Sequence, residues 1–372
     1  MGGGGSERQL LRILQNLDRS KFTPMLYIVH PEGELLHQIP QDVPVIGFWN
    51  RHESPRLNFP GRIHRWQVND LENTIRQFHV DVVYDRTFFM SMITGPACRR
   101  TGTARLSVIV CEPRRDVKAT AGGFVPMKRW LLKKSYQQAT RVLTVSNALR
   151  DEVIRYYDLP AERVITLPNF VDLERIDRLA DEPPPVWESE RFHMVAAGRL
   201  HEQKGYPHLL EALGHLVHER KHEDVLLHIL GNGPLEEQLK ADVRGKRLQW
   251  NVCFHGFVAN PYPYFRAAQL FCLPSLYEGM PNVVLEAMTC CVPVLCTDCP
   301  TGPKEILAEG EFGELVPPGD ALALADAIED AVQNCDKWQA RVAPARQHIQ
   351  TNYAPEVRIG ELEKLLIRVG RK

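Results

Sequence analysis

The sequence lacks several features that would assign it to a class at once. Its 372 residues carry 45 Lys and Arg against 46 Asp and Glu, a formal net charge of -1, whereas a dedicated nucleic-acid-binding protein shows a clear basic excess. No apolar run approaches the roughly 18 residues of a membrane span, and nothing near the start has the pattern of a signal peptide. The nine cysteines are an odd number, which argues against a secreted disulfide scaffold and favours a reducing, cytoplasmic compartment.

The sequence does contain a regular alternation of short apolar runs and amphipathic stretches. The runs are continuous rather than alternating in polarity, which is typical of parallel strands buried on both faces. Between them leucines recur at intervals of three and four, as at Leu209, Leu213 and Leu216. This order predicts an α/β fold with parallel sheets and helices on both sides. The expected strands are 25–30, 81–85, 106–110, 141–145, 193–198, 225–230, 270–274 and 292–297.

A proline-rich stretch interrupts this alternation. Three consecutive prolines at 183–185 can continue neither a helix nor a central strand. We therefore predict an N-terminal domain over 1–182, a linker over 183–190, a C-terminal domain over 191–355, and a final helix over 356–372 that packs back on the N-terminal domain. Two doubly wound domains joined in this way bind ligands in the cleft between them.

The chain begins with a glycine-rich segment ahead of a helix. Ser6 followed by Gln9 is the pattern of a capping box. A glycine-rich turn places backbone N–H groups at the positive end of the helix dipole, so Gly4, Gly5 and Ser6 form a candidate phosphate-binding loop. Gly-Gly-Gly-Gly-Ser is also a common flexible linker, and this alternative stays open. Such a loop normally follows a strand, so we expect the first strand of the N-terminal domain to be missing through an incomplete or misassigned start.

Two loops in the second half carry glycines, and the first of them also carries two cations. GRLHEQKG, residues 198–205, follows an expected strand and places Arg199 and Lys204 five residues apart. Two cations beside a helix start suit a diphosphate, although solvated surface charges fit the same pattern. Gly231 and Gly233 in the next loop, ILGNGPL, permit close backbone approach, and an ordinary turn is the alternative.

The stretch LYEGMPNVVLEAM, residues 276–288, gives the most specific signal. Glu286 follows Glu278 by eight residues, and Pro281 stands where a first helical residue would. Glu278 is therefore expected on a loop and Glu286 inside a helix. The backbone N–H groups of 279–282 would lie at the positive end of that helix. We interpret the stretch as a site for an anionic group and for hydroxyls, with two surface glutamates as the alternative.

In this order and spacing, these three stretches resemble the GT-B retaining glycosyltransferases of family 4. The agreement runs from 169–172 (NFVD) to 317–320 (PPGD), and 297–307 (TDCPTGPKEIL) is similar to bacterial members that build capsules, exopolysaccharides and lipopolysaccharide. GGGGSERQLL and 144–153 (TVSNALRDEV) extend the likeness more weakly into the first half. The resemblance implies two Rossmann-like domains that face each other across a cleft and a nucleotide-sugar donor.

The resemblance also implies roles for individual residues. Arg199, Lys204 and Glu278 are the catalytic candidates, and the two cations hold the diphosphate of the donor. Glu286 binds the ribose, Glu278 and the amides of 279–282 meet the donor sugar, and the turn at 256–258 faces the base. The donor-binding candidates are Gly198, Gly231, Gly233, Phe257, Val258, Gly279, Met280, Pro281, Asn282 and Glu286.

Two departures bear on the chemistry. Another large class of glycosyltransferases binds a metal through Asp-x-Asp, and no Asp-x-Asp occurs in this sequence. Arg199, Lys204 and helix N-termini would then carry the charge, so we expect no metal and no other cofactor. Many relatives have a histidine after the strand expected at 106–110, where this chain has Cys111 and Glu112. Either Glu112 or another group orients the acceptor, or activity is reduced.

Two further features are open to a functional interpretation. Cys290, Cys291, Cys296 and Cys299 include one C-x2-C spacing, but no second one exists, so buried packing thiols are expected rather than zinc ligands. Residues 127–136 place four cations around tryptophan and leucine. Such a basic amphipathic segment is typical of peripheral contact with an anionic membrane, and an ordinary helix that packs its apolar face inward is the alternative.

Together these observations predict a metal-independent, retaining glycosyltransferase. It would transfer a hexose or N-acetylhexosamine from a nucleotide sugar, UDP-linked by preference, to a glycan or polyprenyl-linked acceptor in cell-surface polysaccharide biosynthesis. Its expected place is the cytoplasm, with peripheral contact at the inner face of the plasma membrane. Two alternatives remain: a nucleotide-sugar 2-epimerase on the same fold, and a catalytically weakened nucleotide-sugar-binding protein.

Overall fold

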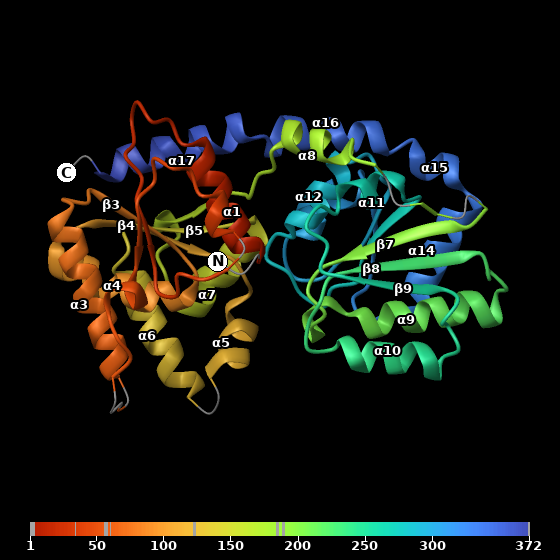
Figure 1. The fold of residues 1–372 in the computed structure, drawn as a ribbon, viewed down its shortest axis with the longest axis horizontal. Coiled ribbons are helices and arrows are strands. Elements are labelled where there is room, and N and C mark those ends of the chain that lie inside the picture. The colour runs from red at the N-terminus through yellow and green to blue at the C-terminus, as the bar shows by residue number, and fades with distance from the viewer. Residues whose placement is uncertain are drawn as a thin grey trace. The chain divides into compact units, whose positions relative to one another are not determined.

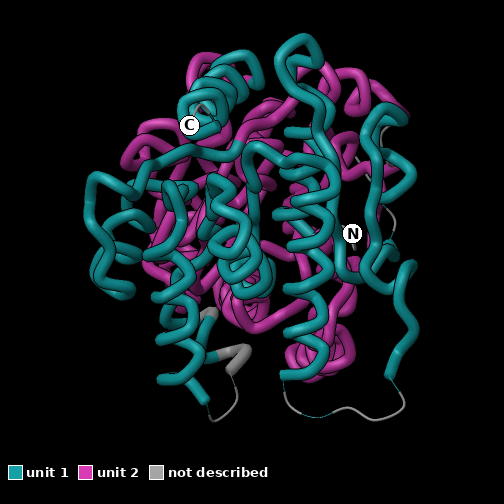
Figure 2. Tube along the Cα trace, turned by 90° about the vertical axis from the view of Figure 1, so that its left-hand side faces the viewer, with its two compact units in different colours: residues 1–169, 355–372 teal, residues 170–354 magenta. Residues whose placement is uncertain are grey.

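The computed structural model describes residues 4–33, 35–55, 59, 61–121, 124–183, 186, 187 and 190–370. By its internal contacts the chain forms two compact units, one of residues 1–169 with 355–372 and one of 170–354 (Figure 2). The contacts therefore divide the chain after Asn169, whereas the sequence places a linker at 183–190. Part of that linker, residues 184, 185, 188 and 189, lies outside the described residues.

The second unit is built on a six-stranded parallel sheet with the order β12-β11-β10-β7-β8-β9. Its strands are β7 (Phe192–Ala197), β8 (Val225–Leu230), β9 (Val252–Gly256), β10 (Leu270–Leu273), β11 (Val294–Thr297) and β12 (Glu314–Val316). The chain winds outward from β7 in one direction and from β10 in the other, so the strand order reverses between these two neighbours. In doubly wound sheets, ligands bind at this reversal point, outside the carboxyl ends of the strands.

Helices cover both faces of this sheet. Figure 1 shows α9 and α10 along one face and α11 and α12 along the other. The helices of the unit are α8 (Leu173–Ala180), α9 (Tyr206–Gly214), α10 (Glu236–Gly245), α11 (Tyr262–Ala267), α12 (Asn282–Thr289), α13 (Pro303–Ile306), α14 (Ala321–Gln333), α15 (Cys335–Gln339) and α16 (Val342–Tyr353). Leu209, Leu213 and Leu216 are fully buried in the core with the strands, which confirms the helical spacing seen in the sequence. The predicted α/β class with parallel sheets is therefore correct.

Three histidines form a chain across neighbouring strands of this sheet. Nδ1 of His193 lies 3.0 Å from Nε2 of His228, and Nδ1 of His228 lies 2.9 Å from Nε2 of His255. Trp187 stacks on His193 and His228 at ring-centroid distances of 4.6 and 4.3 Å. Burial, with the neighbouring imidazoles, lowers the pKa of His228 to about 3. A neutral imidazole donates one hydrogen bond and accepts one, so the uncharged form of His228 can bond to both of its neighbours.

The first unit contains two parallel sheets. The larger has the order β3-β4-β5-β6, and the smaller pairs β1 with β2. The strands are β1 (Leu26–Ile28), β2 (Val45–Gly47), β3 (Val82–Arg86), β4 (Ala104–Ile109), β5 (Arg141–Thr144) and β6 (Val164–Thr166). Its helices are α1 (Gly5–Asn16), α2 (Phe48–Arg51), α3 (Arg62–Gln77), α4 (Phe88–Thr101), α5 (Pro113–Ala121), α6 (Val125–Gln137), α7 (Asn147–Tyr157) and α17 (Pro355–Gly370). In Figure 1, α4 and α6 lie on one side of the larger sheet and α17 on the other.

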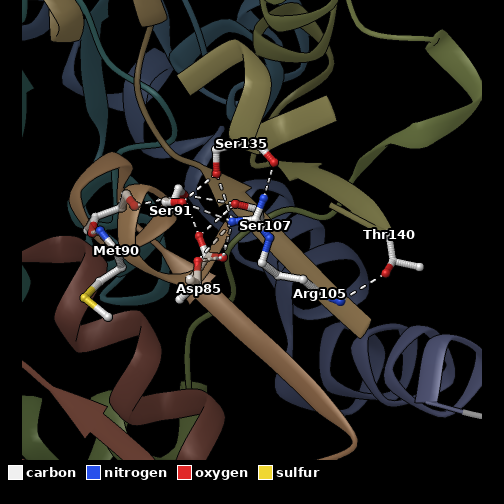
Figure 3. Close-up of polar contacts among 9 residues, drawn as sticks. Asp85, Met90, Ser91, Arg105, Ser107, Ser135 and Thr140 are labelled. Carbon is white, nitrogen blue, oxygen red and sulfur yellow. Dashed lines mark hydrogen bonds and ion pairs between the residues drawn. The ribbon is translucent and has the colours of Figure 1, made fainter. Parts of the chain in front are cut away.

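A buried ion pair joins β3 to β4 in this sheet (Figure 3). Arg105 Nη1 lies 3.5 Å from Asp85 Oδ2, and both side chains are 1% exposed. Ser107 and Ser91 donate to Asp85 Oδ1 at 2.7 and 2.5 Å, while Arg105 also donates to the hydroxyl of Ser135. Because both charged groups have further hydrogen-bond partners, the pair fixes how these elements pack.

The start of α1 differs from the expected capping box. The helix begins at Gly5, with Gly4 as the N-cap in an extended conformation. The carboxylate of Glu7 accepts a hydrogen bond from the Gly4 N–H at 3.1 Å. The Ser6–Gln9 assignment is therefore wrong, because glycine can itself occupy the cap and the glutamate three residues on completes it. No strand precedes α1 among the described residues.

Candidate functional site

Two catalytic candidates from different loops meet where the strand order of the second unit reverses. Lys204 lies in the loop after β7, and Glu278 lies in the loop after β10. Lys204 Nζ is 2.6 Å from Glu278 Oε1, and the side chains are 18% and 7% exposed. The residues that the sequence separates by 74 positions therefore form a largely buried ion pair at the carboxyl edge of the sheet.

The carboxylate of Glu278 is held in place by its own loop. The hydroxyl of Ser275 donates to Glu278 Oε1 at 2.6 Å. The backbone N–H of Glu278 donates to the carbonyl of Pro300 at 2.8 Å, and that of Thr301 returns to the Glu278 carbonyl at 3.0 Å. These bonds fasten the glutamate loop to the TDCPTGP segment, so the carboxylate has little freedom to turn away from Lys204.

The loop of Arg199 and Lys204 is fastened to the same glutamate loop. The N–H of Leu276 donates to the Gln203 carbonyl at 2.8 Å, and Gln203 Nε2 donates to the Tyr277 carbonyl at 2.9 Å. Gly205 has a φ of +64°, and a Cβ there would lie under 3.0 Å from the carbonyl oxygen of Pro274. Glycine is therefore required for the two loops to approach this closely.

The G-x-G loop after β8 packs on the backbone of the first loop. A Cβ at Gly231 would come under 3.0 Å from the Gly198 oxygen, and one at Gly233 would do the same with Leu200. The N–H of Gly231 also donates to the carbonyl of Gly256 at 2.7 Å. The close-approach interpretation of these glycines agrees with this geometry, which brings together the loops after β7, β8 and β9.

Arg199 and Lys204 differ in how they are bound. The Lys204 side chain runs over Gly198, where an added Cβ would lie 3.4 Å from Lys204 Cε. Arg199 is exposed, and its side chain has no hydrogen-bond or ion-pair partner within the part of the chain that the structure describes. The hydroxyl of Tyr206 donates to the Gly198 carbonyl at 3.2 Å, and burial raises the pKa of Tyr206. Lys204 is therefore paired with a carboxylate, whereas the Arg199 side chain is exposed to solvent.

The glutamate-rich stretch has the expected loop and helix. Helix α12 begins at Asn282, one residue later than predicted, because Pro281 is the N-cap with ψ of 104°. Glu286 lies inside this helix and is 5% exposed. Gly279 and Met280 are buried just ahead of the helix start. The amides of this segment therefore lie at the positive end of the α12 dipole.

The remaining donor-side candidates lie after β9. Gly256 has a φ of +64° and ends that strand. Phe257 is 45% exposed and Val258 is partly buried. Their place beside Gly231 is fixed by the hydrogen bond between Gly231 and Gly256, and their role toward a base stays a prediction.

The candidates of the first unit lie at the starts of two helices. Gly4 and Gly5 are exposed at the start of α1, and the Ser6 hydroxyl accepts a hydrogen bond from Arg86 Nε at 3.2 Å. Glu112 directly precedes α5 and forms an ion pair of 2.9 Å with Arg115. Their roles toward a phosphate or an acceptor stay predictions.

The four clustered cysteines do not come together as ligands. Cys290, Cys296 and Cys299 are buried, Cys291 is exposed, and all four are free thiols. Burial raises the pKa of Cys299 to about 12, so this thiol stays protonated. Within the described ranges, no group of three or more His, Cys, Asp or Glu side chains is arranged to hold a metal ion.

Several residues that support the site were not found from the sequence. Ser275, Gln203 and Thr301 hold the loops that carry the catalytic candidates Lys204 and Glu278. Ser275 follows β10 closely, and polar residues at the carboxyl ends of parallel strands are the available signal. The roles of Gln203 and Thr301 depend on contacts between loops far apart in the sequence, for which the sequence carries no local signal.

Residues 127–136 lie in helix α6. Leu132 and Tyr136 are buried, so one face packs inward as in an ordinary helix. Phe124, Met127 and Trp130 nevertheless have exposed fractions of 68%, 55% and 58%. Beside them Arg129 and Lys134 are exposed, whereas Lys128 is buried, and contact with a membrane stays a prediction. No helix in the described part of the chain has the length and apolar character needed to cross a bilayer.

The chain matches known proteins along both halves. Residues 3–175 match the family model described as Glycosyltransferase Family 4, and residues 191–334 match the one described as Glycosyl transferases group 1. The O-antigen chain mannosyltransferase B of Escherichia coli is 31% identical over 224 residues, which are 58% of this chain and 57% of that protein. The N-acetylgalactosamine-N,N'-diacetylbacillosaminyl-diphospho-undecaprenol 4-alpha-N-acetylgalactosaminyltransferase of Campylobacter jejuni is 30% identical over 190 residues, 51% of this chain and 50% of that protein. These matches span little more than half the length of the relatives.

The fold matches solved structures over nearly the whole chain. The HepE protein of Anabaena, crystallised in complex with UDP, aligns with a TM-score of 0.80 at 20% identity, covering 98% of this chain and 96% of that one. A glycosyltransferase from Rickettsia africae aligns with a TM-score of 0.78 at 18% identity, covering 100% and 96%. The two units have the GT-B fold of two Rossmann-like domains.

Proposed function

Because the chain belongs to the group 1 glycosyltransferases of family 4, we propose that it transfers a hexose or N-acetylhexosamine from a nucleotide sugar to a glycan or lipid-linked acceptor, with retention of configuration. The observation that carries this proposal is the Lys204–Glu278 pair at the reversal point of the second sheet. A nucleoside diphosphate bound there would contact a cation, a neighbouring carboxylate and several backbone amides at one place.

The reaction requires that the leaving diphosphate be stabilised as its negative charge grows. In the free protein Glu278 neutralises Lys204 at 2.6 Å, and a bound diphosphate would compete for the same ammonium group. Arg199, which has no side-chain partner among the described residues, would add the second cation and a planar fork for two phosphate oxygens. Preorganised charges of this kind act without reorganisation during the reaction. We propose that they suffice without a metal ion.

The sugar and the nucleoside would be bound by the neighbouring elements. Glu278, held by Ser275, would accept hydrogen bonds from hydroxyls of the donor sugar, and the amides ahead of α12 would bind its anionic neighbour. Glu286 would accept from the ribose, and the turn at 256–258 would face the base. Uracil is our preference for the base, and the UDP complex of HepE on the same fold supports it.

The acceptor side would belong to the first unit. The relative from Campylobacter acts on a diphospho-undecaprenol-linked substrate by its name, which supports a lipid-linked acceptor in cell-surface polysaccharide synthesis. Lys134 Nζ lies 5.2 Å from the ring centre of the exposed Trp130, and Trp with basic neighbours is typical of a membrane surface. We therefore place the protein in the cytoplasm, with α6 against anionic lipid of the inner leaflet.

The donor part of the proposal is tested by a panel of nucleotide sugars. A thermal-shift screen selects the base and sugar, and NMR of the product with a glycan or prenyl-linked acceptor reports the anomeric configuration. Lys204→Ala and Arg199→Ala should each lower turnover by about 10²-fold or more. Lys240→Ala is the matched control, since Lys240 forms a partly exposed ion pair with Glu236 on α10 of the same unit.

Three outcomes would contradict the proposal. Near-normal turnover of Lys204→Ala would remove the diphosphate role. A new sugar without any acceptor would indicate an epimerase. Binding of the donor without transfer or hydrolysis would indicate a binding protein.

A further inference from the structure

Arg86 is a buried cation without a counter-ion among the described residues. It ends β3 at the carboxyl edge of the first unit's larger sheet and is 8% exposed. Its Nε donates to Ser6 Oγ at 3.2 Å, its Nη1 to Tyr84 Oη at 3.2 Å, and its Nη2 to Asn169 Oδ1 at 2.5 Å. All three acceptors are uncharged. Within the described residues, no carboxylate lies within ion-pair distance of Arg86.

The neighbouring strand shows how the same sheet treats another buried arginine. Arg105 on β4 is neutralised by Asp85, with its remaining N–H groups directed to hydroxyl and carbonyl oxygens (Figure 3). A buried charge without such a partner costs free energy, because uncharged hydrogen-bond acceptors replace its lost hydration only in part. The sheet therefore compensates Arg105 internally and leaves Arg86 to be compensated from outside the described chain.

The groups around Arg86 are arranged to donate hydrogen bonds. A guanidinium has five N–H groups, and three hydrogen bonds are made by Arg86. The hydroxyl oxygens of Ser6 and Tyr84 each accept a hydrogen bond from Arg86, so their hydroxyl protons can be donated to another group. Ser6 also lies in the first turn of α1, a helix of 12 residues whose positive end is at this point. The matching ligand carries negative charge and only acceptor oxygens.

Glu7 is the acidic group closest in sequence to this place. Its carboxylate caps the Gly4 N–H at 3.1 Å, and among the described residues no ion pair joins it to Arg86. The Glu7 carboxylate therefore satisfies the backbone N–H of Gly4 and forms no ion pair with the guanidinium of Arg86. A second anion can be held on the Arg86 and Ser6 side.

We propose that Arg86, together with the hydroxyls of Ser6 and Tyr84, binds a phosphate group of the acceptor. The assignment of the phosphate to the acceptor rests on the proposed function, because donor phosphates are assigned to the second unit. The phosphate could belong to a prenyl diphosphate or to a phosphorylated glycan, which present the same oxygens. Arg86 is then a binding and positioning residue for the acceptor. The sequence patterns indicate only Gly4, Gly5 and Ser6 as phosphate-binding candidates in this region.

Binding measurements on the full chain test this without requiring transfer. Geranyl diphosphate and glucose 1-phosphate are the two probes, titrated by calorimetry into the wild-type protein, Arg86→Met and Arg86→Lys. Arg86→Met should weaken binding by at least about tenfold, and Arg86→Lys should fall between because lysine lacks the planar fork. Arg76→Met, which removes an exposed partner of Glu72 on α3, is the control and should bind like wild type.

Unfolding temperatures separate a binding role from a structural one. In phosphate-free buffer Arg86→Met should melt at or above the wild-type temperature, because a buried uncompensated charge is replaced by an apolar side chain of similar length. The probes should raise the melting temperature of wild type and leave that of Arg86→Met unchanged. Binding of the prenyl probe alone would assign the phosphate to a lipid carrier, and equal binding of both would assign it to phosphate as such.

Two results would overturn the inference. One is the same probe affinity in wild type and Arg86→Met, and the other is no probe binding by wild type at millimolar concentration. UDP titrations keep this test apart from the proposed function. Loss of the probes with unchanged UDP binding supports the Arg86 site, whereas failure of the wild type to bind any nucleotide sugar contradicts the proposed function alone.

Discussion

Gly231→Ala tests whether the close approach of backbones at the second unit's sheet edge is needed for donor binding. Gly231 has a φ of +141°, and a Cβ at this position would lie under 3.0 Å from the carbonyl oxygen of Gly198. An alanine in such a conformation costs about 1–3 kcal/mol. The clash also requires the segment that carries Arg199 to move by roughly 1 Å, a displacement that can cost about 10²-fold in rate.

The effect should therefore appear in both stability and function. We expect Gly231→Ala to lower the free energy of unfolding by about 1–3 kcal/mol, to weaken UDP binding, and to lower turnover by about 10²-fold. Calorimetric titration with UDP and denaturant unfolding provide the two measurements. Gly245→Ala is the matched control, since Gly245 ends α10 and a Cβ there meets nothing within 4 Å. Wild-type UDP affinity and turnover in Gly231→Ala would refute the reasoning.

Three other predictions concern the core, the pH dependence and the surface. Arg105→Ala should destabilise the protein by about 3–5 kcal/mol in urea unfolding, because it leaves the buried Asp85 without its cation, and a loss below about 1 kcal/mol would contradict this. The pKa of His228 is lowered to about 3 in the folded protein, so below about pH 6.5 the unfolded chain binds more protons than the folded one. The free energy of unfolding should therefore fall from pH 6.5 toward pH 3, by at most about 1.4 kcal/mol per pH unit. His228→Gln should flatten this pH dependence, and an unchanged slope in that variant would contradict the role of His228. Neutralising Arg129, Lys133 and Lys134, or replacing the exposed Trp130 by alanine, should reduce co-sedimentation with anionic liposomes. Undiminished co-sedimentation would exclude the α6 surface.

The elements that the sequence predicted are those with long apolar runs. β7 and β8 each extend over six residues in register, and such runs give a clear signal for buried parallel strands. Four strands, β2, β6, β9 and β12, were not expected. Three of them, β2, β6 and β12, have only three residues each, too few for any period to show, although β1 of the same length was expected within 25–30. Their place in the sheets follows from pairing with neighbouring strands, which is a tertiary effect.

One rule about parallel sheets predicts part of the candidate site. Residues after parallel strands meet at the carboxyl edge of the sheet, and this rule correctly brings Lys204 and Glu278 together. It does not specify that the two form an ion pair or that Ser275 holds the carboxylate. The contact of Arg86 with Ser6 joins residues 80 positions apart, and no spacing in the sequence indicates it.

A crystal structure of the protein with UDP tests the central claim most directly. We predict diphosphate oxygens within hydrogen-bond distance of Lys204 Nζ and of the Arg199 guanidinium, next to the amides that lead into α12. A nucleotide bound elsewhere, with Lys204 still paired to Glu278 and Arg199 directed to solvent, would contradict the account.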